Sequence, residues 1–215
     1  TAGGTGKRFS SSVPKQFLPL LGIPVLMRTI DVFNQWNNKA QIILTLPKDW
    51  LEYWQELIQT HEFNIAHAIV EGGQERFHSI KNALDSCNGD YVMIHDGVRP
   101  LVNEDTLNRC ISSLEIKKAV IPVVVLQESI RAINENSSSS LDRKEYVRVQ
   151  TPQCFCIEVL KKSYEGEYRD IYTDDASVVE ASGNSIYMEQ GNAENIKITT
   201  PLDFELAEAI LKLNP

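Results

Sequence analysis

The feature that most constrains the fold is a regular alternation of short apolar segments with helix-length segments. Four apolar runs, rich in valine and isoleucine, stand at 41–47, 66–70, 90–96 and 119–125. Such runs are typical of strands in a parallel sheet that helices cover on both faces. Helical patterns separate or flank them at about 24–36, 48–61, 74–86 and 103–114. The alternation predicts an α/β fold with a mostly parallel sheet flanked by helices. Ligands of such sheets bind beyond the carboxyl ends of the strands.

The alternation breaks at about 127–148, where two short strand-like pieces flank a serine-rich centre. We expect a protruding β-arm here, with Ser137 to Ser140 as its mobile tip. The last third of the chain predicts, in order, a helix at about 156–165, a helix after 173–177, strands at 185–190 and 195–199, and a final helix. Thr200 and Pro201 are typical cap and first residues of that final helix. We expect a single domain over residues 1–215, with the arm included.

Charge is distributed unevenly along the chain. The net charge of −8 argues against a general nucleic-acid binder. Residues 1–30 nevertheless hold four basic side chains and no acidic one. A positive segment on an acidic protein indicates a site for a small anion. No apolar run approaches the roughly 18 residues that a membrane helix needs, so we expect a soluble protein without a membrane partner.

The cysteines and the first residues bear on the compartment. Cys87, Cys110, Cys154 and Cys156 form neither a CxxC pair nor a zinc spacing, which favours ordinary thiols in a reducing cytoplasm. No signal peptide is recognisable. The sequence opens at Thr1 directly inside a glycine-rich motif, so we expect a further strand upstream, and targeting stays open.

The segment 2–16, AGGTGKRFSSSVPKQ, carries the strongest signal for phosphate binding. Its backbone can approach a phosphate closely at three glycines, Gly3, Gly4 and Gly6. It is not a P-loop, because Arg8 stands where Ser or Thr is needed, and Phe9 replaces the third glycine of a dinucleotide fingerprint. Arg8 and Lys15 can straddle one triphosphate across the loop, and Pro14 restricts the backbone before Lys15. The alternative is a plain surface turn with solvated charges.

Four further segments carry candidate ligand contacts. In 95–100, HDGVRP, Asp96 suits magnesium or a hydroxyl and Arg99 suits a phosphate, unless the two side chains simply pair. The turn of 72–79, GGQERFHS, places backbone amides before a helix, where Glu75 and Arg76 are a possible structural ion pair. The remaining two are 173–177, TDDAS, and 195–201, NIKITTP.

The last two segments also have purely structural explanations. TDDAS reads as a helix start with Thr173 as cap and two acids at the positive end of the helix dipole. Lys197 alternates with two isoleucines in an expected strand. It therefore faces either solvent or a polar pocket, and alternation alone favours solvent.

Taken together and in order, these motifs resemble the 2-C-methyl-D-erythritol 4-phosphate cytidylyltransferases of the non-mevalonate isoprenoid pathway. The resemblance runs nearly from end to end and includes 151–153, TPQ. It implies a Rossmann-like nucleotidyltransferase fold whose β-arm embraces a second subunit of a homodimer. It also implies transfer of CMP from CTP to methylerythritol phosphate, with release of pyrophosphate and with Mg²⁺ bridging the phosphates.

The resemblance assigns roles residue by residue. The cations that stabilise developing charge match Arg8, Lys15 and Lys197, which moves Lys197 from solvent into the site. The CTP contacts match Ala2, Gly3, Gly4, Gly6, Gly73 and Ser79. The residues around the metal and the sugar phosphate match Asp96, Arg99, Ser129, Thr151 and Thr173, with Asp96 as the metal ligand. Arg143, in the arm, matches an arginine that reaches into the neighbour's site.

Three positions depart from the family pattern. Gln74 stands where an Asp is frequent near CTP, and Ser129 stands where a Thr is common. Gly97-Val98 replaces the more usual Ala-Ala, and the related ribitol-5-phosphate cytidylyltransferases also carry a Val before the Arg. A ribitol-5-phosphate or other polyol-phosphate enzyme is therefore the alternative function.

Overall fold

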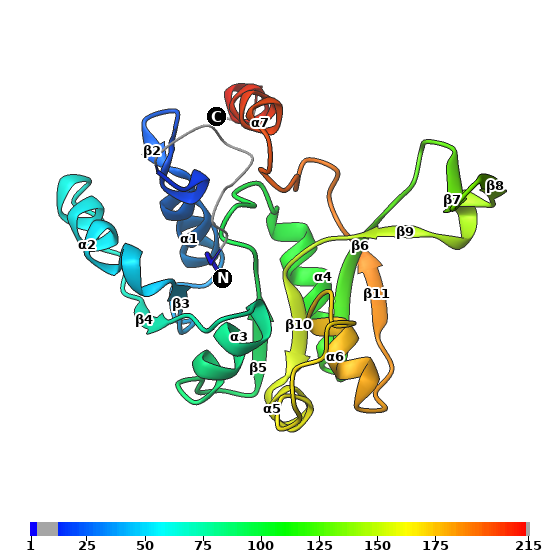
Figure 1. The fold of residues 1–215 in the computed structure, drawn as a ribbon. Coiled ribbons are helices and arrows are strands. Elements are labelled where there is room, and N and C mark those ends of the chain that lie inside the picture. The colour runs from blue at the N-terminus through cyan, green and yellow to red at the C-terminus, as the bar shows by residue number, and fades with distance from the viewer. Residues whose placement is uncertain (4–12, 214–215) are drawn as a thin grey trace.

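The computed structural model describes residues 1–3 and 13–213 and has the expected α/β architecture (Figure 1). Its helices are α1 (Val25–Trp36), α2 (Leu51–Thr60), α3 (Arg76–Leu84), α4 (Glu104–Leu114), α5 (Ile157–Ser163), α6 (Asp175–Ala181) and α7 (Pro201–Leu213). Its strands are β1 (Pro19–Leu20), β2 (Ile23–Pro24), β3 (Ile43–Leu46), β4 (Ala68–Glu71), β5 (Tyr91–Ile94), β6 (Ala119–Val125), β7 (Ile130–Asn134), β8 (Ser137–Leu141), β9 (Val147–Val149), β10 (Gln153–Cys156) and β11 (Tyr187–Gln190). Short 3₁₀ turns occupy Lys15–Phe17, Lys48–Trp50 and Arg143–Glu145.

The larger sheet has the order β11-β6-β10-β5, and β9 pairs with the far end of β6. β11 is parallel to β6, whereas β10 is antiparallel to both of its neighbours. β5, β6 and β11 therefore run in one direction, and β10 runs against them. The sequence analysis missed β10, because QCFC is short and lacks an apolar run of the kind that marks the other strands.

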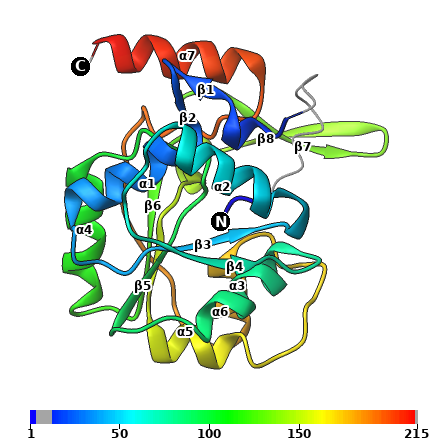
Figure 2. The ribbon, with the colours of Figure 1, turned by 90° about the vertical axis from the view of Figure 1, so that its left-hand side faces the viewer.

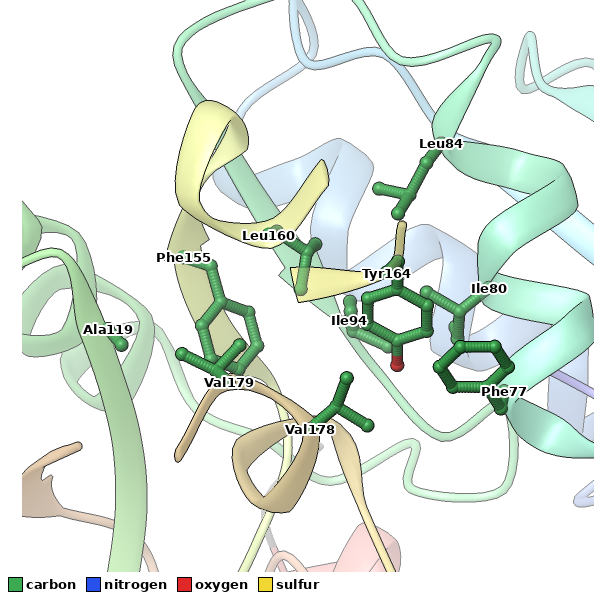
Figure 3. Packing of buried hydrophobic residues seen from close by; sticks show 10 residues of the cluster. All are labelled: Phe77, Ile80, Leu84, Ile94, Ala119, Phe155, Leu160, Tyr164, Val178 and Val179. Atoms are coloured by element: carbon green, nitrogen blue, oxygen red, sulfur yellow. The ribbon is translucent and has the colours of Figure 1, made fainter. Parts of the chain in front are cut away.

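Successive residues of a strand face opposite sides of a sheet, and this alternation separates two helical layers. Val120 and Cys154 pack with Cys110 and Leu114 of α4. Their neighbours Ala119 and Phe155 pack instead with side chains of α3, α5 and α6, as Figure 3 shows. Helices therefore cover both faces of the sheet, as the apolar strand pattern predicted.

A second parallel ladder, β3 with β4, stands beside β5. Residues 1–2 connect the two parts, since the Ala2 amide donates to the Thr45 carbonyl (3.1 Å) and the Gly97 amide donates to the Thr1 carbonyl (2.8 Å). An apolar cleft of about 530 Å³ lies between β3 and β5, lined also by α1 and α3. Of the predicted catalytic residues that the structure describes, Lys15 and Lys197, neither lines this cleft.

The arm projects away from the body of the molecule beyond β6 and β9 (Figures 1 and 2). It is a β7–β8 hairpin in which Asn134 pairs with Ser137 and Ile130 with Leu141. The prediction of Ser137 to Ser140 as a mobile tip is wrong, because these serines form β8. The Arg131 side chain donates to both the hydroxyl (2.9 Å) and the carbonyl (3.0 Å) of Ser138, which ties the serine strand to β7.

In the C-terminal part of the chain, one predicted strand is wrong and one predicted helix start is confirmed. Residues 195–199 are not a strand: the Ile198 amide bonds to the Val98 carbonyl (3.0 Å) in the loop after β5 rather than to a strand edge. α7 begins at Pro201 as predicted, and the Thr200 hydroxyl accepts from the Asp203 amide (3.3 Å), which is the expected cap. α7 packs its apolar side against Leu20, Val98 and Ile198.

The four cysteines are free thiols. Within residues 1–3 and 13–213, no helix combines the length and the apolar character needed to cross a membrane.

Candidate active site

A polar cavity of about 380 Å³ lies beyond the carboxyl ends of β4 and β5. Among the described residues, its walls come from residues 1–3, the 3₁₀ turn that begins at Lys15, the end of β3, the turn after β4 with the start of α3, the loop after β5, and Lys197. It gathers seven of the predicted site residues, Ala2, Gly3, Lys15, Gly73, Ser79, Asp96 and Lys197. The fold therefore brings together side chains that are up to 195 positions apart, at the edge of the sheet that the parallel-strand argument indicated.

The glycine turn between β4 and α3 forms one wall. The Gly72 amide donates to the Leu46 carbonyl (2.7 Å), and the Gly73 amide donates to the Ser79 hydroxyl (3.0 Å). A Cβ atom on Gly73 would lie 2.3 Å from the Cβ of His78, a separation that real Cβ atoms do not adopt. Glycine is therefore required at position 73 by close packing against the first turn of α3.

Replacing Gly73 with alanine is expected to displace this turn. The clash should lower stability by about 1–3 kcal/mol, and it should weaken the CTP binding that the family resemblance implies by about tenfold or more. Thermal unfolding and calorimetric titration with CTP measure the two effects. Gly166→Ala is the matched control, because a Cβ atom on Gly166 would meet nothing within 4 Å. Unchanged CTP affinity in Gly73→Ala would exclude this turn from nucleotide binding.

Asp96 is the buried carboxylate of the cavity lining. Its Oδ2 atom lies 3.0 Å from Nε of Arg99 and 3.1 Å from Nζ of Lys197. Burial alone would raise the pKa of this carboxyl, but the positive charges of Lys197 and Arg99 outweigh burial and hold the pKa well below its usual value. Asp96 is therefore ionised at neutral pH. The pairing alternative for Asp96 and Arg99 is confirmed, and Asp96 also lines the cavity; ligand binding by either residue stays a prediction.

A buried polar network holds Asp96 from behind. The Asp96 amide donates to the Thr151 hydroxyl (3.1 Å), and that hydroxyl also contacts Nδ1 of His95 (3.1 Å). Nε2 of His95 lies 2.9 Å from the Arg99 carbonyl, which assigns the ring proton to Nε2. Burial lowers the pKa of His95 to about 3, so the ring is neutral at physiological pH. Thr151 thus lies against the backbone of Asp96 and fixes it.

Lys15 and Lys197 approach the cavity from different segments. Lys15 begins a 3₁₀ turn directly after Pro14, and Phe17 of the same turn is anchored in the core beside Trp54. Lys15 is only 9% exposed although it carries a charge. The Lys197 side chain is 45% exposed and reaches Asp96. Lys197 is exposed, as alternation alone favoured, and it also lines the polar cavity, although its segment is not a strand.

The remaining predicted residues fall into three groups. Gly4, Gly6 and Arg8 lie outside the described residues. Arg99 is nearly buried behind Asp96, where its Nη1 donates to the Asn195 carbonyl (2.8 Å). Ser129 and Arg143 are exposed on the arm, and Nη1 of Arg143 donates to the Gln127 carbonyl. Within the described chain, these two arm residues do not line the cavity.

Two local predictions about helix starts are wrong. α6 is capped by Asp174 rather than by Thr173, because the Asp174 carboxylate accepts from the Ser177 amide (2.9 Å). Thr173 is exposed one position earlier, and its amide donates to the Ser177 hydroxyl (3.1 Å). Arg76 pairs with Asp175 of α6 instead of with its neighbour Glu75.

Arg76 and Thr45 are among the cavity residues that were not singled out as ligand contacts from the sequence. Arg76 reaches the cavity from the first turn of α3. The buried hydroxyl of Thr45, at the end of β3, also lines the cavity and has no hydrogen-bond partner among the described residues. The position of Thr45 near the carboxyl end of an apolar strand was the available signal.

Comparison with known proteins decides the family. The model of the 2-C-methyl-D-erythritol 4-phosphate cytidylyltransferase family matches residues 1–213. The chain belongs to this family. A cytidylyltransferase of that name from Bacteroides fragilis is 50% identical over 211 residues, which cover 98% of this chain and 96% of the relative. The namesake from Lachnospira eligens is 37% identical over 219 residues, with 98% and 96% covered.

Solved structures of cytidylyltransferases share the fold. The 2-C-methyl-D-erythritol 4-phosphate cytidylyltransferase of Thermus thermophilus superimposes with a TM-score of 0.79 at 26% identity, covering 93% of this chain and 94% of that one. The enzyme of the same name from Francisella tularensis gives 0.80 at 26% identity, covering 96% and 95%. The predicted family, fold class and nucleotidyltransferase activity are confirmed, and the ribitol phosphate alternative is not favoured.

Proposed function

We propose that this cytidylyltransferase joins CTP to 2-C-methyl-D-erythritol 4-phosphate in the polar cavity described above. The observation that supports this site is the gathering of Lys15, Lys197, Gly73 and Asp96 around one space of about 380 Å³ at the carboxyl edge of the sheet. The turn at Gly73 and Ser79 offers the nucleotide close backbone approach. Lys15 and Lys197 supply positive charge for the triphosphate, and Arg8 is proposed to add to it.

The reaction needs alignment more than acid–base chemistry. An oxygen of the substrate phosphate attacks the α-phosphorus of CTP, a new P–O bond forms, and the bond between the α-phosphorus and the bridging oxygen breaks. The electron pair of that bond leaves with pyrophosphate. Because a phosphate monoester is largely dianionic near pH 7, it requires no general base. Catalysis then rests on in-line positioning and on neutralising charge at the phosphates.

Asp96 is the residue proposed to hold Mg²⁺. The contacts of its carboxylate with Arg99 and with Lys197 are both made by the Oδ2 atom. The described residues contain no group of three or more His, Cys, Asp or Glu side chains that could hold a metal ion. One ionised carboxylate suits the usual magnesium site of nucleotide enzymes, where substrate phosphates and water complete the shell. When bound, the metal would offset negative charge on the triphosphate.

Pyrophosphate release tests the substrate assignment. The protein is incubated with CTP and Mg²⁺, and methylerythritol phosphate and ribitol 5-phosphate are compared in parallel. We expect turnover with methylerythritol phosphate and at least about a hundredfold lower kcat/KM with ribitol 5-phosphate. Faster turnover with ribitol 5-phosphate would assign the enzyme to polyol phosphates.

In the structure, Val98 packs against Leu20 and Ile198, so a core role explains the valine at that position.

We further propose that the whole chain acts as one domain in the cytoplasm, and that its arm completes the site of a second subunit. Arg143 and Ser129 are exposed on an arm that extends away from the cavity of their own chain. Ile133 in the arm (86%) and Val125 at the end of β6, beside the arm (72%), expose apolar surface that a partner subunit would cover. A homodimer in which Arg143 contacts the substrate of the partner subunit would give Arg143 a role in the site and would cover the exposed apolar side chains.

Mixing two inactive variants tests this shared site. Arg143→Ala lacks the arm arginine, and Lys15→Ala lacks the cavity lysine. In a hybrid dimer one of the two sites would have both residues intact. At equal concentrations half of the dimers are hybrids, so we expect recovery of about a quarter of wild-type activity. No recovery after subunit exchange, with the exchange verified by mass spectrometry of labelled subunits, would contradict the shared site.

A further inference from the structure

A buried ion pair joins the first turns of α3 and α6. Nη1 and Nη2 of Arg76 donate to Oδ1 and Oδ2 of Asp175, each at 2.6 Å. The hydroxyl of Tyr164 donates to the same Oδ1, also at 2.6 Å. Asp175 is completely buried, so its carboxylate depends on these three hydrogen bonds for charge compensation.

One end of this network is at the cavity and the other end is in the core. Arg76 lines the cavity beside Gly73, and its side chain is 34% exposed. Tyr164 is 2% exposed and stacks on Phe77, the residue that follows Arg76, with ring centroids 4.7 Å apart and planes inclined by 18°. Figure 3 shows the two rings side by side in the apolar cluster.

A second contact fixes the first turn of α6 to the main sheet. The Gln153 side chain donates to Oδ2 of Asp174 (2.7 Å) and accepts from the Ala176 amide (2.9 Å). Gln153 belongs to β10, two residues after Thr151, which holds Asp96. The beginning of α6 is therefore rigidly placed relative to the loop that carries Asp96, and Asp175 extends this placement to Arg76.

We propose that Asp175, together with Tyr164, is a positioning residue for catalysis that acts through Arg76. It locks the glycine turn of 72–75, where the nucleotide is proposed to bind, against the turn of 173–174, where the family resemblance implies a sugar-phosphate contact at Thr173. A buried ion pair contributes little net stability compared with an apolar contact, so stability alone does not account for three hydrogen bonds at this junction. This role rests on the proposed function of the two turns.

Steady-state kinetics of Tyr164→Phe and Asp175→Asn test the role. Neither side chain lines the cavity, and Arg76 is the cavity residue to which Asp175 is directly hydrogen-bonded. Misalignment lowers kcat more than it changes binding. We expect kcat to fall about threefold to tenfold in Tyr164→Phe and more than about tenfold in Asp175→Asn, with both KM values within about threefold of wild type.

Ser163→Ala is the matched control. Ser163 precedes Tyr164 on α5, and its hydroxyl contacts the Ser182 hydroxyl at the opposite end of α6 (2.7 Å). It also joins α5 to α6 but does not reach Arg76. The control should lower Tm and keep wild-type kcat per folded molecule. A Tyr164→Phe enzyme that behaves in the same way would reduce the network to a structural contact and overturn the proposal.

A double-variant cycle gives a second criterion. If Asp175 acts through Arg76, Arg76→Lys combined with Asp175→Asn should lose no more kcat than the more impaired single variant. Additive losses would mean that the two residues act separately, against the proposal. Failure of the proposed function itself is seen separately, because the wild-type protein would then release no pyrophosphate.

Discussion

Replacing Lys15 with alanine is expected to lower kcat by at least about a hundredfold. Lys15 lines the cavity, and its buried position leaves little room for water to substitute for its charge. A preorganised cation in such a site stabilises developing charge on the phosphates without reorganisation, and removal of one comparable group typically costs on the order of 10²-fold or more. Stopped assays of pyrophosphate release, normalised to folded protein, measure the loss.

Lys48→Ala is the matched control for this prediction. Lys48 also begins a 3₁₀ turn directly after a proline, but it is exposed and does not line the cavity. We expect it to retain wild-type kcat. Loss of only about twofold in Lys15→Ala would mean that the lysine binds neither the triphosphate nor the transition state, and the proposed role would be wrong.

The second large effect is expected for Asp96→Asn. The amide keeps the shape of the side chain but removes the negative charge between Arg99 and Lys197, which then repel each other at one oxygen. It also removes the carboxylate proposed to hold Mg²⁺. We expect kcat to fall on the order of a hundredfold and the Mg²⁺ concentration at half-maximal rate to rise about tenfold or more.

The magnesium titration separates the two contributions of Asp96. If the carboxylate only holds the two cations, kcat falls while the Mg²⁺ dependence stays that of the wild type. That outcome would contradict the proposed metal site and leave the ion-pair cluster standing. Asp31→Asn, on α1 and away from the cavity lining, should change neither quantity.

The sequence predicts the parts of this fold that depend on local patterning. β6 has the predicted bounds, 119–125, because its continuous apolar run reflects burial on both faces. β10 could not be predicted in the same way, since a four-residue antiparallel strand with a polar first residue leaves no periodic signal. The serine strand β8 was missed because serine is more typical of loops, and its pairing depends on Arg131 across the hairpin.

The candidate site likewise contains residues that local sequence patterns placed correctly and residues that they did not. Glycine turns and strand ends placed Gly73 and Asp96 correctly at the carboxyl edge, because sheet topology alone brings these ends together. Lys197 required the family resemblance, since its own segment is not a strand. The pairing of Arg76 with Asp175 spans 99 positions. No local sequence pattern shows which acidic side chain Arg76 will pair with.

Tracking the α-phosphate of CTP tests the central claim most directly. CTP labelled at the α-phosphorus is incubated with methylerythritol phosphate, Mg²⁺ and enzyme, and the products are separated chromatographically. We expect the label in 4-diphosphocytidyl-2-C-methyl-D-erythritol, in amounts equal to the pyrophosphate released. Label recovered as CMP would indicate hydrolysis rather than transfer, and label that stays in CTP would show no reaction. Either result would contradict the proposal that this cavity joins the two substrates.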